Sequence, residues 1–158
     1  ASNHIGAAHF AYEAGIKVTH VPFGGSTDMI AALRGNHVDA TVAKISEVGN
    51  LVKNNELRIL ASFTENKLEN FPDVPTLKEN GYNVLFGSAR AIVAPTGTPQ
   101  EVVQKLHDTF KEALESQDNI EKSKNANLPL QYMSPEELTN YINEQETYIK
   151  EIVPKLGI

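Results

Sequence analysis

Extended and helical patterns alternate through residues 1–63, and this alternation constrains the fold more than any other feature of the sequence. β-branched and alternating apolar runs at residues 17–22, 38–43 and 57–63 predict three strands. Apolar side chains at helical spacing predict helices before and between these strands. Strand, helix, strand, helix, strand with short loops is typical of parallel β-α-β units. We therefore expect an α/β protein whose three strands form one parallel sheet.

Each of the first three predicted helices begins at a residue whose side chain can accept a hydrogen bond from the N–H groups of the first turn. These candidate N-caps are Ser2 or Asn3, Ser26 or Thr27, and Ser46. In an open parallel sheet, helix starts that follow strands gather at the carboxyl edge, where ligands bind. Free N–H groups and the positive end of the helix dipole suit a carboxylate or a phosphate there, although every parallel α/β protein has such starts.

The second half of the chain is mostly helical in pattern. Thr98 and Pro99 predict the start of one helix, residues 117–127 form a weaker one, and Ser134 begins the capping box of the last. Pro154 is expected to end or kink that last helix.

One face of the last predicted helix is apolar. Its residues are Leu138, Tyr141, Ile142, Tyr148, Ile149 and Ile152. We expect this face to pair with another chain, which would be self-association, or to remain as an exposed apolar patch.

A long extended segment at residues 84–94 is interrupted by Gly87 and Ser88. It is either a crossing between two lobes or a single bulged strand. Arg90 lies in this segment among apolar and small residues. An arginine in such a setting needs a protein carboxylate as a partner, or an anionic ligand that its guanidinium holds in a bidentate pair.

Charge and cysteine content exclude several classes of function. The net charge is −6 and there is no basic run, so we expect no nucleic-acid partner. The absence of cysteine excludes disulfides, thiol catalysis and cysteine zinc sites. The sequence opens on a helix-cap pattern without an initiator methionine, so we expect a fragment or a processed chain.

A search for reactive groups finds little. The G-x-S-x-G, P-loop and G-x-G-x-x-G motifs are absent. His4 and His9 lie roughly 140° apart around a helix and cannot share a metal from one face. His20 is expected to be a packed or surface residue, and His37 and His107 to be solvated. We therefore expect no catalytic residue, no cofactor and no metal.

Six motifs resemble, in the family order, the substrate-binding proteins of tripartite tricarboxylate transporters, the Bug family. They are VPFGGS at residues 21–26, GNHVD at 35–39, LRILA at 57–61, FPDVPTL at 71–77, RAIVAPTGTP at 90–99 and SPEE at 134–137. The segments PDVPT and APTGTP are the most specific of them. The resemblance covers nearly the whole chain, but only about the C-terminal half of a family member.

This resemblance implies a type II periplasmic-binding-protein fold, in which two α/β lobes close on a ligand. Residues 1–88 would form most of the second lobe, and residues 89–158 the crossover strand and the C-terminal helices of the first. The ligand-binding residues that the resemblance implies are Ser2, Asn3, His4, Phe23, Gly24, Gly25, Ser26, Ala43, Lys44 and Arg90. Ala43, Lys44 and Ala89 depart from the family pattern, and the lysine fits a ligand with more negative charge.

The expected function is that of an extracytoplasmic solute-binding protein, periplasmic or anchored as a lipoprotein. It would pass a small carboxylate to membrane permease subunits and do no chemistry. The alternative is the ligand-sensing effector domain of a regulator with the same two-lobe fold. A small α/β enzyme would need a reactive constellation that the sequence does not show.

Overall fold

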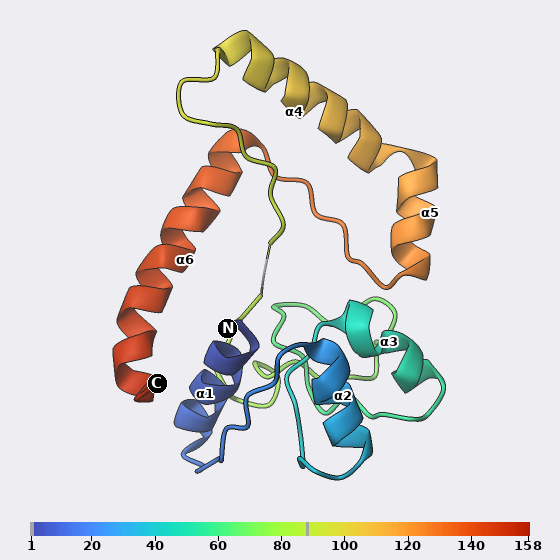
Figure 1. The fold of residues 1–158 in the computed structure, drawn as a ribbon, viewed down its shortest axis with the longest axis vertical. Coiled ribbons are helices and arrows are strands. Elements are labelled where there is room, and N and C mark those ends of the chain that lie inside the picture. The colour runs from blue at the N-terminus through green and yellow to red at the C-terminus, as the bar shows by residue number, and fades with distance from the viewer. Residues whose placement is uncertain (1, 88) are drawn as a thin grey trace. The chain divides into compact units, whose positions relative to one another are not determined.

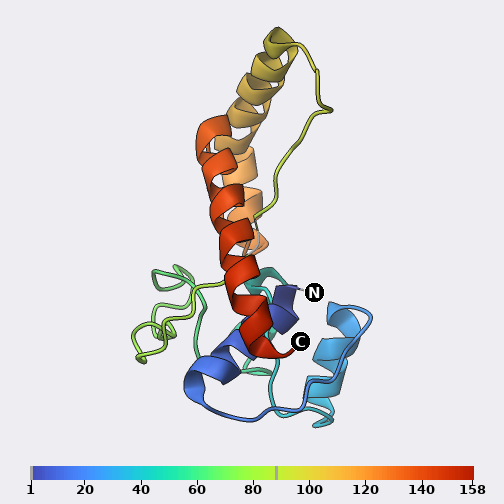
Figure 2. The same ribbon diagram turned by 90° about the vertical axis from the view of Figure 1, so that its left-hand side faces the viewer.

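The computed structural model describes residues 2–87 and 89–158, and omits the side chain of Ser2 (Figures 1 and 2). The helices of these residues are α1 (Ser2–Ala14), α2 (Ser26–Arg34), α3 (Ile45–Lys53), α4 (Gln100–Glu115), α5 (Gln117–Asn125) and α6 (Pro135–Leu156). None of them is both long enough and apolar enough to cross a membrane.

Internal contacts divide the chain into two compact units. The larger unit contains the chain before residue 88 together with Asn143–Ile158, and the smaller unit is Ala89–Ile142. Helix α6 therefore begins in the smaller unit and ends in the larger one. We describe each unit by itself.

The three segments predicted as strands do not pair with one another in the described part of the chain. Only two isolated bridges occur there, a parallel one between Ser62 and Thr76 and an antiparallel one between Leu68 and Phe71. The expected sheet of three parallel strands is therefore not present in these residues. An extended segment becomes a strand only when a neighbouring segment lies close enough to form hydrogen bonds with its N–H and C=O groups. Leu60, in the third of these segments, is instead 63% exposed.

The core of the larger unit gathers around the turn that follows residue 75. Val84 is fully buried, and Thr76 and Leu77 are almost so. The Ser62 N–H donates to the Pro75 carbonyl at 2.9 Å, and the Leu77 N–H donates to the Ser62 carbonyl at 2.8 Å. Thr76 and Glu79 cap each other, because each side chain accepts a hydrogen bond from the backbone N–H of the other. These bonds fix the turn, so Leu77 is held against the core.

Helix α1 packs in the larger unit against the later turns of α6, which lie beside it in both ribbon views (Figures 1 and 2). The buried ring of His9 bonds through Nδ1 to the Tyr148 hydroxyl at 2.5 Å, and its Nε2 lies 3.7 Å from Glu13 Oε1. A Cβ added at Gly6 would lie 3.1 Å from Cδ1 of Phe86, so a side chain at this helix position would require the Phe86 ring to shift. Helix α1 is thus held by the buried imidazole of His9 against α6 and by a close backbone approach at Gly6 to Phe86.

Acid should weaken this contact through His9. Burial is the main cause that lowers the pKa of His9 below 6.5, and nearby Glu13 opposes it. The unfolded chain therefore takes up a proton more readily than the folded chain below about pH 6.5. We expect the free energy of unfolding to fall between about pH 7.5 and pH 5, and His9→Gln to reduce that fall. Urea titrations at both pH values measure it. The control is His37→Asn, on an exposed turn, and an equal fall in His9→Gln and wild type would contradict the expectation.

Several helix boundaries differ from the sequence predictions by one residue. Gly25, not Ser26 or Thr27, occupies the N-cap of α2. Helix α3 begins at Ile45 rather than Ser46, with Lys44 at its N-cap. Pro99 is the N-cap of α4, and Thr98 instead donates its hydroxyl to the Pro95 carbonyl. The capping box at Ser134 is confirmed, because its hydroxyl and the Glu137 carboxylate each accept from the other's N–H.

Pro154 lies inside α6 and does not end it, contrary to that part of the expectation. A proline removes only one N–H donor, and here it falls in the last turn of the helix. The helix stops next to Gly157, whose φ of +67° is a left-handed conformation that glycine adopts readily.

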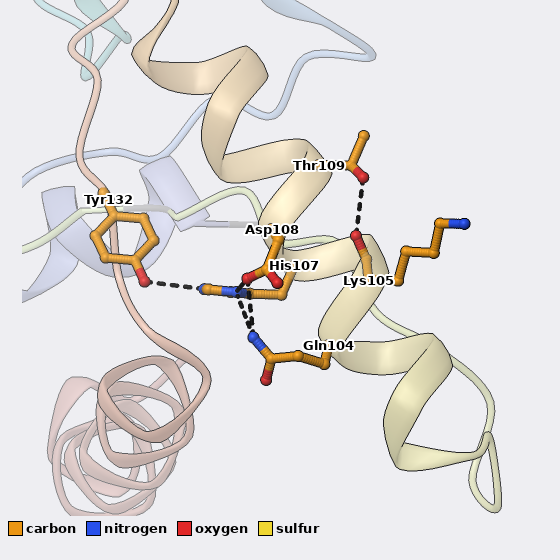
Figure 3. Close-up of polar contacts among 6 residues, drawn as sticks. All are labelled: Gln104, Lys105, His107, Asp108, Thr109 and Tyr132. Atoms are coloured by element: carbon orange, nitrogen blue, oxygen red, sulfur yellow. Dashed lines mark hydrogen bonds and ion pairs between the residues drawn. The ribbon is translucent and has the colours of Figure 1, made fainter.

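The smaller unit contains a polar cluster that Figure 3 shows in detail. His107 on α4 bonds through Nε2 to the Tyr132 hydroxyl at 2.9 Å and through Nδ1 to Asp108 Oδ1 at 2.8 Å. Gln104 also donates to Asp108 Oδ1, and both hydrogen bonds lower the pKa of that carboxyl. The expectation that His107 is simply solvated is therefore wrong: a chain segment 25 residues away supplies a partner for its second nitrogen.

Candidate anion-binding site

The candidate ligand-binding residues fall at three helix starts of the larger unit, with one exception. The larger unit holds Ser2, Asn3, His4, Phe23, Gly24, Gly25, Ser26, Ala43 and Lys44. Arg90 belongs to the smaller unit.

The start of α1 carries the most specific geometry. The half-buried ring of His4 stacks on the ring of His20, with centroids 3.5 Å apart and planes inclined by only 9°. The pKa of His4 is lowered, first by burial and then by the positive charge that His20 can carry. Asn3 beside it is also half-buried. Nothing is described of the Ser2 side chain, so its predicted role lies outside the described residues.

The loop of residues 23–26 leads into α2 without a side-chain cap. Gly25 at the N-cap is extended, and in the described part of the chain no side-chain cap is found at this helix start. A Cβ added at Gly25 would meet nothing within 4 Å. The N–H groups of the first turn are therefore open to an external acceptor, which is the arrangement that binds anions. Phe23 beside them is 37% exposed.

One acidic group lies at this loop. Asp28 is in the first turn of α2, and its Oδ2 would be 3.9 Å from a Cβ added at Gly24. This carboxylate stabilises the helix start through the dipole but repels an anion that approaches it. An anion at α2 therefore needs positive groups nearby to offset Asp28.

Lys44 is the positive residue at the start of α3. Its backbone N–H donates to Glu47 Oε2 at 3.0 Å, which closes the helix start. Its side chain is exposed and, among the described residues, has no ion pair. Ala43 before it is half-buried and leaves no long side chain next to the lysine. The lysine is therefore available to an anionic ligand.

Arg90 is exposed and makes no ion pair with any described carboxylate. Of the two partners considered for it, the protein carboxylate is therefore not found in the described part of the chain. An exposed guanidinium that is always charged can form a bidentate pair with a carboxylate ligand.

Metal binding has little support in this arrangement. Within residues 2–87 and 89–158, no three histidine or acidic side chains come together as metal ligands. His4 and His20 offer two imidazoles, but parallel stacked rings direct their nitrogens alongside one another rather than toward a common point.

His20 is exposed and its ring packs against that of His4, in agreement with the expectation of a packed or surface residue. The contact with His4 itself was not predicted, and its one signal in the sequence is the position of His20 three residues before the loop that begins at Phe23.

The fold is that of a receptor with the periplasmic-binding-protein architecture. A TctC solute binding protein from Polaromonas superposes with a TM-score of 0.81 at 26% identity, over 98% of this chain and 54% of the other. Rpa4515 of R. palustris, solved with adipate, gives a TM-score of 0.88 at 24% identity over 100% and 53%. These neighbours confirm the expected α/β class, although the described residues form no sheet of their own.

The sequence then identifies the family. The family model described as "Tripartite tricarboxylate transporter family receptor" matches residues 1–158, and the chain belongs to this family. The UPF0065 protein in the gbd 5′ region of Cupriavidus necator is 33% identical over 155 residues, which are 98% of this chain and 47% of that protein. The chain thus spans about half the length of the relatives it matches. The resemblance inferred from six motifs is confirmed.

Proposed function

We propose that this chain forms the ligand-capturing part of an extracytoplasmic solute-binding receptor. It holds a small carboxylate and passes it to the membrane permease subunits of a tripartite-tricarboxylate-type transporter, and it does no chemistry. The observation that carries this proposal is the family match over all 158 residues. In support, the glycine loop leaves the start of α2 without a side-chain cap.

Each part of the proposed site has a separate role. The proposed role of the N–H groups at the start of α2 is to bind one carboxylate, and that of His4, at the start of α1, is to line the same site. The Lys44 ammonium adds positive charge, and Arg90 supplies a bidentate partner. We further propose the lobe assignment expected from the family: residues 1–88 as most of the second lobe, and residues 89–158 as the crossover and the helices of the first.

A dicarboxylate is the ligand class that we propose. Within the larger unit, the Lys44 ammonium has no described acidic partner and the N–H groups at the start of α2 have no described side-chain cap, so each of two carboxylates has a group that suits it. Rpa4515, which shares the fold, was solved with adipate, and this makes adipate a reasonable first probe. Its uncharged analogue 1,6-hexanediol has the same chain length and tests whether the charges matter.

Nuclear magnetic resonance titration of this chain with adipate tests the proposal. We expect binding near the millimolar range, about 4 kcal/mol, with shifts at the amides of residues 24–28 and 44–46. Lys44→Ala should weaken binding about two- to fivefold, because an exposed charge pair contributes less than about 1 kcal/mol. The matched control is Lys124→Ala on α5, another exposed lysine. Equal effects of adipate and hexanediol on these amides would refute the proposal.

A further inference from the structure

The His4–His20 stack joins two parts of the proposed site. His4 lies in the first turn of α1, and His20 lies in the extended segment that leads to the loop at Phe23. Their rings are nearly parallel at 3.5 Å. Any charge on one imidazole therefore acts directly on the other.

Each ring of the stack can carry only a positive charge. Because His20 faces His4 at 3.5 Å, a proton on one ring disfavours a proton on the other. Among the described residues, neither ring forms an ion pair with a carboxylate. Two adjacent imidazoles without a counter-ion hold a second proton poorly, since like charges disfavour double protonation. A bound anion would supply the missing counter-ion.

We propose that the His4–His20 stack takes up a proton when a carboxylate binds, so that capture strengthens as the medium becomes more acidic. This inference rests on the proposed function and adds to it a proton-linked regulation of the same site. His20 acts here as a positioning residue, because it sets the charge that His4 can carry toward the ligand.

The size of the effect follows from linkage. If up to one proton accompanies each anion, the association constant changes by at most tenfold for each pH unit. Between about pH 8 and pH 6.5 both carboxyls of adipate stay ionised, so any change in affinity belongs to the protein. We expect adipate to bind about three- to tenfold more tightly at about pH 6.5 than at about pH 8.

The experiment follows the imidazole resonances and the backbone amides of this chain during adipate titrations at both pH values. In the wild type, adipate should move the titration midpoints of His4 and His20 upward. The double variant His4→Asn with His20→Asn should bind adipate with the same affinity at both pH values. His37→Asn, which alters an exposed histidine in a turn, should retain the wild-type pH dependence.

The outcomes separate this inference from the proposed function. If adipate shifts the amides of the α2 loop equally at both pH values and leaves the imidazole midpoints in place, the proton linkage is wrong and carboxylate capture stands. If adipate shifts neither the amides nor the imidazole resonances at either pH, both the proton linkage and the proposed carboxylate capture are wrong. Should the double variant not fold, the movement of the wild-type imidazole midpoints alone decides between support and refutation.

Discussion

Replacing Leu77 with alanine should destabilise the larger unit by about 2–5 kcal/mol. The side chain is only 5% exposed, and the backbone on both sides of it is fixed by bonds to Ser62 and by the Thr76–Glu79 cap. A turn held in this way cannot collapse to fill the space that the lost side chain leaves, so most of the cavity cost remains. Urea unfolding followed by circular dichroism measures the change.

Leu60→Ala is the matched control for this experiment. It removes the same atoms from a leucine in the same unit that is 63% exposed. We expect a change within about 0.5 kcal/mol, because little apolar surface is buried there. Similar losses in both variants would mean that the core does not lie around the turn at Leu77.

Replacing Arg90 with alanine should weaken adipate binding by about tenfold or more. A hydrogen bond to a charged group contributes about 1.5–3 kcal/mol, and because Arg90 is exposed we expect its bidentate pair to contribute near the lower end of that range. Arg90 has no described acidic partner that could compensate or compete. Isothermal titration calorimetry of variant and wild type with adipate measures the loss.

Arg58→Ala is the corresponding control for Arg90. Arg58 is also an exposed arginine in an extended segment, but it belongs to no part of the proposed site. We expect its loss to leave adipate binding nearly unchanged. Unaltered affinity in Arg90→Ala would remove Arg90 from the site, and equal losses in both variants would indicate a general charge effect.

Local sequence signals located the helices because their causes lie within a few residues. The capping box at Ser134 predicts the start of α6, and α1 ends before Gly15, whose φ of +65° is a conformation that glycine adopts readily. The one-residue error at α2 arose because Gly25 and Ser26 are both acceptable N-caps. The candidate site residues, whose role in binding stays a prediction, follow the same local signals, because all of them except Arg90 lie at or close to a helix start.

The amino-acid sequence by itself determined the family, the helices and the candidate cations Lys44 and Arg90, because motifs and caps are read from neighbouring residues. Only the tertiary structure decided which histidines have partners. His9 forms a hydrogen bond with Tyr148, which is 139 residues away in the sequence, and His107 forms one with Tyr132, which is 25 residues away. The stack of His20 on His4 and the pairing of Ser62 with Thr76, rather than with another predicted strand, depend equally on where distant parts of the chain come to lie. Sequence periodicity does not predict such contacts, because a side chain's long-range partner is set by packing rather than by its neighbours in sequence.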